Sequence, residues 1–322
     1  MLERAADDLE ACGPVWRVTE PVAGLPGGAL VALRFLGATH RQALEGSAPG
    51  LAAHYPSCGG DGDADAAWRA LLALTETAAA TRELDAALTR GVQTNEVGRC
   101  AALLGGFLDV ARATGLPLTL LEVGASAGLN LRWDGFRCSG WGPRDSPVDL
   151  GDPWVGDHRP VLAPPEVPIA SRWGCDLDPV DPVSAHGRMT LLSFVWPDMD
   201  RRFALLDAAC RVAAAIPASV DRASADTWVA ERLHERGEAT ATVVFHSVVL
   251  QYLDAGARAR FGATIAAAGA AATPTSPLAW LRLEPAGALG PSEFEVRLTT
   301  WPGGHDRRLA MAHPHGTWVR WE

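Results

Sequence analysis

The segment from Leu118 to Asn130 constrains the fold of this chain more than any other. Its sequence, LTLLEVGASAGLN, reads as a buried strand, an acidic residue and a turn of small residues that opens a helix. Small residues let backbone N–H groups approach a ligand closely, and a helix N-terminus favours anionic or polar groups. A carboxylate before the first glycine suits a cationic or hydroxyl-rich ligand. The segment therefore predicts a nucleoside-like cofactor site.

Charge and composition exclude several classes of protein. The formal net charge of −10 argues against binding to nucleic acids, which requires a densely basic surface. The sequence contains no lysine, which removes P-loop nucleotide hydrolases, protein kinases and pyridoxal-phosphate enzymes. The six cysteines are scattered without a C-x-x-C pair, as is typical of reduced thiols. No signal peptide or bilayer-spanning run is visible, so we expect a cytoplasmic protein with no membrane partner.

The pattern along the chain changes near residue 116. Residues 1–115 predict an N-terminal helical region, with helices over 64–88 and 95–114. Beyond it, strands spaced by helices predict a mostly parallel sheet with crossover connections. We expect strands at 118–123, 168–175, 240–245, 278–284, 294–300 and 318–321, and helices at 201–215, 225–236 and 255–270. The last two strands predict an antiparallel hairpin at a sheet edge. Insertions at 132–167 and 178–200 fit the alternation poorly, and act either as binding loops or as decorations held by buried tryptophans.

The motif Glu122-x-Gly124-x-Ser126-x-Gly128, together with the order of strands, resembles class I S-adenosylmethionine-dependent methyltransferases. In that family the middle position is glycine, and serine is a small replacement for it. The resemblance covers about residues 116–322 and implies a Rossmann-like domain with S-adenosylmethionine as cofactor. It implies that Glu122 orients the site and that backbone N–H groups around Ser126–Leu129 hold the amino-acid part of the cofactor. The cofactor-binding candidates in this segment are Glu122, Gly124, Ser126, Gly128 and Asn130.

Two further acids resemble elements of the same family. Asp176 follows the second predicted strand, at the position of the acid that binds the ribose hydroxyls. Asp226 opens a predicted helix, at the position of the turn that contacts adenine. Glu122 and Asp176 are further apart in sequence than is usual in the family, because the first insertion separates them.

The turn after the strand at 240–245 carries the candidate catalytic residues His246, Gln251 and Tyr252. In the methyltransferase interpretation this turn faces the methyl group and an unknown small or peptide-like substrate. His246 is a candidate general base because the ordinary pKa of histidine lies near neutrality. The alternative is a structural histidine bonded to the backbone.

A polar group at the start of the second helix comprises Asn95, Glu96 and Arg99. With Arg172, these residues are candidates for the substrate cleft, and helix capping explains Asn95 and Glu96 equally well. His305, His313 and His315 match no known zinc spacing, so we expect no metal site.

Across nearly the whole chain, the sequence is similar to a bacterial family known as domain of unknown function 2332. The likeness rests on segments at 93–96, 122–130, 146–148, 172–181, 196–198 and 246–252. That family brings no substrate, so two alternatives to a methyltransferase stay open. One is a non-catalytic member of the fold that binds a nucleoside ligand or a protein partner. The other is a serine hydrolase, because Gly124 to Gly128 also spells G-x-S-x-G, with Ser126 as nucleophile and Asp226 with His246, or His305 or His313, as its partners.

Overall fold

The computed structural model describes residues 2–20, 31–77, 84, 88, 91–287 and 293–322. The chain forms two units: unit 1 is Met1–Thr94 with Ser184–Asp207, and unit 2 is Asn95–Val183 with Ala208–Glu322. The helix after residue 95, which the sequence analysis placed in the N-terminal region, lies in unit 2 because it packs against the sheet. Most of the second predicted insertion lies in unit 1.

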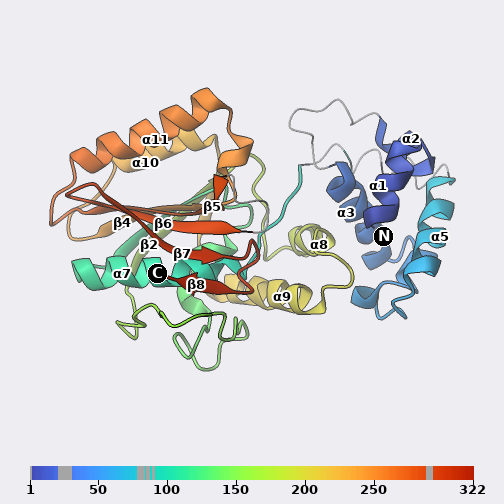
Figure 1. Cartoon of the computed structure of the whole chain (residues 1–322), viewed down its shortest axis with the longest axis horizontal. Helices are drawn as coiled ribbons and strands as arrows, with labels where there is room; N and C mark the ends of the chain where they lie inside the picture. The colour runs from blue at the N-terminus through green and yellow to red at the C-terminus, as the bar shows by residue number, and fades with distance from the viewer. Residues whose placement is uncertain (1, 21–30, 78–83, 85–87, 89–90, 288–292) are drawn as a thin grey trace. The chain divides into compact units, whose positions relative to one another are not determined.

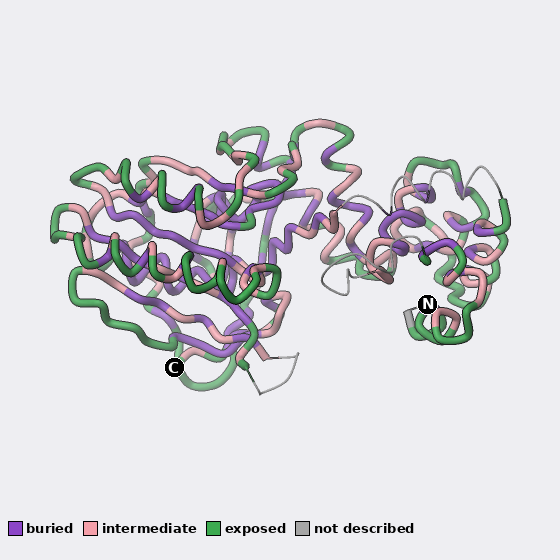
Figure 2. Tube along the Cα trace, turned by 90° about the horizontal axis from the view of Figure 1, so that it is seen from above, coloured by how far each residue is buried: buried purple, intermediate pink, exposed green. Residues whose placement is uncertain are grey.

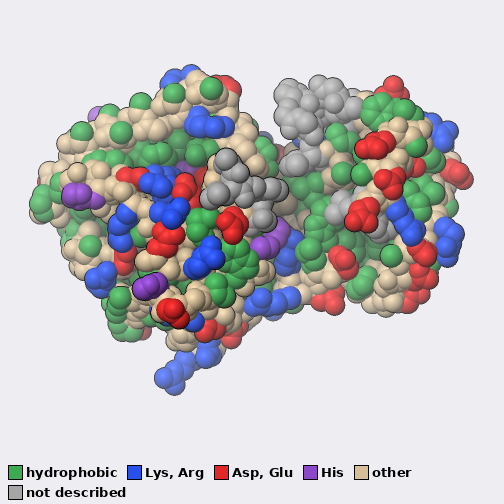
Figure 3. Space-filling model, in the orientation of Figure 1, with side chains coloured by type: hydrophobic (Ala, Val, Ile, Leu, Met, Phe, Trp, Pro, Cys, Tyr) green, Lys and Arg blue, Asp and Glu red, His purple; other side chains and the backbone are tan. Residues whose placement is uncertain are grey.

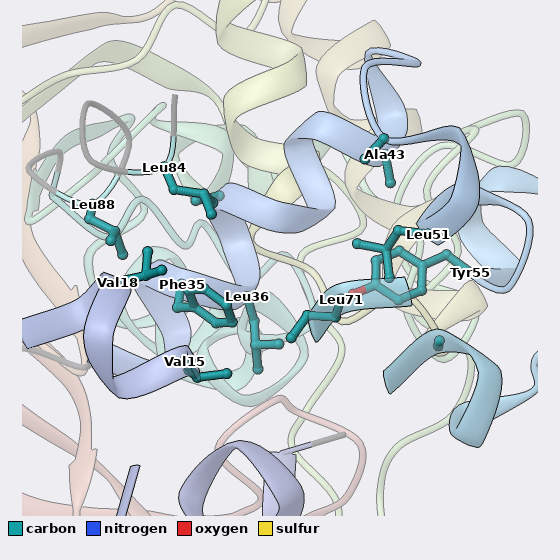
Figure 4. Packing of buried hydrophobic residues seen from close by; sticks show 13 residues of the cluster. Val15, Val18, Phe35, Leu36, Ala43, Leu51, Tyr55, Leu71, Leu84 and Leu88 are labelled. Carbon is teal, nitrogen blue, oxygen red and sulfur yellow. The ribbon is translucent and has the colours of Figure 1, made fainter. Parts of the chain in front are cut away.

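Unit 1 is built from short helices around an apolar core. Its elements are α1 (Leu2–Glu10), α2 (Pro14–Thr19), α3 (Val31–Leu44), α4 (Pro49–Ala52), η2 (Pro56–Cys58), α5 (Ala64–Thr75), α8 (Ala185–Ser193) and the start of α9 (Asp200–Ala215). In Figure 4, Val15 and Val18 of α2 face Phe35 and Leu36 of α3, and Leu71 of α5 extends the cluster. Helix α5 begins where Asp63 accepts the N–H groups of the first turn. It ends earlier than predicted, and residues 78–83 and 85–87 of the predicted helix lie outside the described residues.

Unit 2 is built on one sheet of eight strands in the order β3-β2-β1-β4-β5-β6-β7-β8. The pairs from β3 to β5 are parallel and those from β5 to β8 are antiparallel. The strands are β1 (Leu118–Val123), β2 (Ile169–Asp176), β3 (Ser219–Arg222), β4 (Ala241–Ser247), β5 (Leu278–Pro285), β6 (Phe294–Trp301), β7 (His305–Ala312) and β8 (Val319–Trp321). The predicted mostly parallel α/β sheet with an antiparallel end is therefore confirmed.

Helices cover both faces of the parallel part. Helix α7 (Arg99–Thr114) packs against β4 to β7 on one face, and α10 (Ala225–His234) and α11 (Ala255–Ala270) lie together on the other (Figure 1). Buried residues follow the strands between these layers, and exposed residues follow the outer turns of the helices (Figure 2). This burial on both faces explains why β1 is an almost continuous apolar run.

The predicted elements differ from the structure at four points. Strands β3 and β7 were not predicted, and β7 lies between the two strands that were expected to form a hairpin. Helix α8 lies inside the segment 178–200, where none was expected. The exposed first half of β7, which carries Arg307 and Arg308, has no apolar alternation, and this hid the strand.

The first insertion is an irregular segment packed against the α7 face of the sheet. Trp133 stacks on Phe107 of α7 at a centroid distance of 4.5 Å and on Trp141 at 5.2 Å. These tryptophans are buried, so they hold the insertion in place. On the face seen in Figure 3, arginines lie beside carboxylates. In unit 2, Arg282 and Arg297 both pair with Asp306. No helix within the described ranges is long and apolar enough to cross a bilayer.

Candidate functional site

The strand order defines where a ligand can bind. After β1 the chain builds β2 and β3 on one side, and it then returns to place β4 on the other side of β1. In open α/β sheets, ligands bind outside the carboxyl ends of the strands at such a reversal. Three segments meet there: the loop of residues 124–128 after β1, the residues after β2 and the turn of residues 248–253 after β4. The predicted cofactor loop and catalytic turn therefore share the carboxyl edge.

The backbone of the loop after β1 is bonded within the protein. The Ser126 N–H donates to Oδ2 of Asp176 at 2.8 Å. The N–H groups of Ala127 and Leu129 donate to the side-chain oxygen of Asn95 at 3.3 and 2.9 Å. Ser126 is held at a φ of 53°, which a side chain other than glycine adopts rarely. The donors that were expected to hold the amino-acid part of a cofactor are thus already used.

The two glycines of the loop are covered by side chains. A Cβ at Gly124 would lie 2.5 Å from Cγ2 of Val249, and one at Gly128 would lie 2.8 Å from Cγ2 of Val220. Both glycines have a φ of 66°, so they provide the left-handed turn as well as the close approach. The small residues let protein side chains approach the backbone at these two points.

The loop does not open an α-helix. It leads into η3 (Leu129–Gly135), a 3-10 helix interrupted at Arg132 by non-helical backbone angles. Arg172 of β2 supports this segment through two 2.7 Å bonds to the carboxylate of Asp134 and one to the carbonyl of Leu131. The expected helix N-terminus is therefore wrong, and Arg172 braces η3 with its guanidinium already bonded.

Glu122 lies beneath the loop and is 3% exposed. Its carboxyl group bonds the Asn130 side chain, and its Oε2 has no hydrogen-bond partner among the described residues. Burial raises the pKa of Glu122 well above its usual value, and the nearby positive charge of Arg132 opposes this only in part. Arg132 is itself buried and bonds the carbonyls of Gly128 and Ile216. Glu122 thus lies inside the protein instead of lining an open surface.

Glu122 and His246 lie on opposite faces of the sheet. In the parallel pairing, Glu122 is level with Phe245 and Val123 is level with His246. Phe245 contacts Phe107 of α7, whereas the His246 ring contacts Phe261 of α11 at 5.7 Å. Since side chains alternate between faces along a strand, Glu122 cannot share one pocket with His246.

His246 is fully buried, and both of its ring nitrogens are bonded. Nδ1 lies 2.6 Å from Oε1 of Glu284, and the indole N–H of Trp280 donates to Nε2 at 3.0 Å. Because an indole only donates, Nε2 is the acceptor and Nδ1 carries the proton. No nitrogen remains to take a proton from a substrate. This geometry is that of a structural histidine and argues against the predicted general base.

The same carboxylate holds the turn after β4. Oε1 of Glu284 also accepts the N–H groups of Val249 and Leu250, at 2.9 and 3.4 Å. The turn begins at Val248, whose φ of 62° is strained for a β-branched residue. The candidates Gln251 and Tyr252 lie at its exposed end, and Tyr252 is 64% exposed. Glu284 was not predicted, and its only signal is an acid at the end of an otherwise apolar strand.

The polar group before α7 joins three parts of unit 2. Glu96 pairs with His315 at 3.0 Å. Arg99 donates to the carbonyls of Pro314 and Ser247, at 3.0 and 3.3 Å. These contacts bring Glu96 and Arg99 to the carboxyl edge, together with Asn95, but in bonded, structural positions.

Asp226 lies in the first turn of α10, shortly after β3 ends at the carboxyl edge, where the Ala223 N–H donates to the carbonyl of Asp176. It bonds Ser224 at the start of α10 and Arg260 of α11, so it ties the two helices together. This leaves no catalytic pairing of Asp226 with His246, whose nitrogens are bonded elsewhere. Among the described residues, no group of three or more His, Cys, Asp or Glu side chains is placed to hold a metal ion.

Comparison with known proteins gives the family of the chain. A search of curated proteins finds no match, and a search of solved structures finds none either. A family model described as "Uncharacterized protein conserved in bacteria (DUF2332)" matches residues 1–321. The family likeness expected from the sequence is confirmed, and since the match spans nearly every residue, the chain belongs to this bacterial family.

Proposed function

We propose that this chain binds an adenosine-bearing ligand, S-adenosylmethionine, at the carboxyl edge between β2 and β4, and that it acts as a methyltransferase on a small or peptide-like substrate. The observation that carries the proposal is the strand order with an acid at the end of both β1 and β2, Glu122 and Asp176. The first acid is buried and the second is half-buried at the edge, so Asp176 is the one that a ligand can reach.

Asp176 fits a ribose. Each of its carboxylate oxygens accepts one backbone N–H, from Ser126 and from Asp178. An ionised carboxylate has about four acceptor sites, so Asp176 keeps capacity for two hydroxyl groups. The loop of residues 124–128 does not fit the amino-acid part of the ligand, because its N–H groups are bonded and its glycines are covered. In this proposal Asp176 is therefore the main polar anchor.

The chemistry follows from positioning. When bound, the sulfonium supplies the methyl group, and alignment with the acceptor can account for most of the rate. His246 has no free nitrogen, so the acceptor has to be an atom that is nucleophilic without a protein base. Gln251 and Tyr252 are the predicted catalytic residues that remain exposed and able to contact a substrate.

Titration calorimetry with S-adenosylmethionine and S-adenosylhomocysteine tests the proposal. We expect both to bind the full chain, and Asp176→Asn to weaken binding about 10- to 100-fold, since one charged acceptor of two hydroxyls is lost. The matched control is Asp178→Asn, because Asp178 is adjacent but its side chain pairs with Arg222. Absence of both heat and a thermal shift with either ligand at millimolar concentration would falsify the proposal.

A second candidate is a non-catalytic member of the fold. The burial and full pairing of His246 favour it, because the predicted general base has no nitrogen left to take a proton from a substrate. It predicts that the ligand binds but that no methyl group leaves it. Incubation with methyl-labelled S-adenosylmethionine and pools of amines, thiols and peptides separates the two: label transfer that Tyr252→Phe reduces supports an enzyme, and binding without transfer supports the second candidate.

A further inference from the structure

His40 of α3 and Ser57 of η2 form a hydrogen-bonded pair in unit 1. Ser57 Oγ lies 2.7 Å from Nε2 of His40, and Nδ1 of the same ring lies 3.1 Å from the carbonyl oxygen of Ser193. Because a carbonyl oxygen only accepts, Nδ1 carries the proton and Nε2 accepts the Ser57 hydroxyl. The order of hydroxyl, base and orienting group is that of an activated serine nucleophile.

His40 is buried and uncharged, whereas Ser57 is accessible to a reagent. His40 is 1% exposed, and burial lowers its pKa to about 4. The imidazole is therefore uncharged at neutral pH, with its lone pair directed at Ser57. Ser57 is only half-buried, so a reagent can approach its side of the pair.

The turn that carries Ser57 is rigid but offers no anion site. The N–H groups of residues 57–60 all donate to carbonyl oxygens of unit 1, that of Ser57 to Pro197 at 2.9 Å. The bonds fix the serine against His40. They also leave no donor in the turn for a negatively charged intermediate, so the reaction depends on an activated substrate.

We propose that Ser57 is a nucleophilic serine that takes an acyl group from an activated ester, with His40 as its base. Ser57 Oγ bonds the carbonyl carbon and the ester C–O bond breaks. The serine proton passes to Nε2 of His40 and then to the departing alcohol, and water later releases the acid. Without anion donors, the acyl-serine accumulates. Nearby apolar side chains, including Cys58 and Trp196, suit an uncharged acyl group.

The test is labelling of the full chain by a fluorophosphonate probe, with the modified peptide located by mass spectrometry. We expect label on Ser57 in the native protein and none there after unfolding in urea, since the activation depends on His40. Ser57→Ala should remove this label, and His40→Gln should slow it at least about 100-fold. Ser47→Ala is the matched control, because the Ser47 hydroxyl donates to the carbonyl of Gln42 and its removal should leave labelling unchanged.

Three results would overturn the inference: a native protein unlabelled at Ser57, equal labelling of native and unfolded chain, or undiminished labelling in a folded His40→Gln variant. The first two need no variant, so they hold even where His40→Gln fails to fold. Peptide mapping separates Ser57 from Ser126, the serine of the G-x-S-x-G match. The result is independent of S-adenosylmethionine binding, because Ser57 and Asp176 belong to different units.

Discussion

Of the two glycines in the loop after β1, Gly124 has the closer side-chain neighbour. Its φ is 66°, and a Cβ there would lie 2.5 Å from Val249. Gly124→Ala should lower the free energy of unfolding by more than about 2 kcal/mol, because left-handed strain of about 1–2 kcal/mol adds to a steric clash. Hydrogen exchange of the β1 amides measures the change in unit 2.

Gly115, which ends α7, is the control for this substitution. Its φ is 64°, and a Cβ there would meet nothing within 4 Å. Gly115→Ala should therefore show the strain alone. In a Val249→Ala background, the effect of Gly124→Ala should fall to that at Gly115. Equal effects of the two substitutions in the wild-type background would show that no side chain is packed against Gly124.

The sequence was sufficient to name the residues at the carboxyl edge of the sheet. It was not sufficient to predict how far each of them is exposed. Glu122 lies near the end of β1, Ser126 lies in the loop that follows β1, and His246 lies near the end of β4. Their availability depends on partners from distant segments, such as Asn95 and Glu284. A motif records spacing along the chain, and it carries no information about which distant side chain occupies a donor.

At the scale of the element, the turn of residues 248–253 depends on one carboxylate oxygen. Glu284 Oε1 accepts bonds from His246, Val249 and Leu250. Glu284→Gln should destabilise unit 2 by about 1.5–3 kcal/mol, because bonds to a charged acceptor are lost or weakened. The amides of Val249 and Leu250 should exchange faster with solvent.

The matched control is Glu295→Gln on the neighbouring strand β6. Glu295 pairs with Arg297 in a partly exposed contact, and surface pairs contribute about 0–1 kcal/mol. The amides of Val249 and Leu250 could exchange with solvent equally slowly in Glu284→Gln and in Glu295→Gln. The Glu284 carboxylate would then not be the group that holds the strained backbone at Val248.

Elements with a strong periodic pattern were predicted closely. β1 and α11 have the predicted bounds, since β1 is an almost continuous buried run and α11 begins where Asp254 accepts the N–H of Ala257. The four-residue β3 and the charged β7 were not found, because an edge or half-exposed strand needs no apolar alternation. The order of strands requires pairing between distant segments, which local patterns do not encode.

At the scale of the whole molecule, two buried groups give the two units opposite responses to pH. In unit 1, the pKa of His40 is lowered to about 4, so the unfolded chain takes up a proton first as the pH falls below 6.5. In unit 2, the pKa of Glu122 is raised well above 4.5, so the unfolded chain releases its proton first as the pH rises. Lowering the pH from 6.5 to 4.5 therefore lowers the free energy of unfolding of unit 1 and raises that of unit 2.

Hydrogen exchange at pH 7.5 and 5, corrected for the intrinsic rate, tests this difference. Stability in α3 should fall by about 2 kcal/mol on acidification, and stability in β1 should rise. The lowered pKa values of Asp221, Asp226 and Asp306 act below about pH 4 and leave this window unaffected. His40→Gln should flatten the response of α3 alone, and Glu122→Gln that of β1 alone. If the stability of both units changed in the same direction with pH in the wild type, the assignment to His40 and Glu122 would be wrong. A common pH dependence requires a titrating group other than these two.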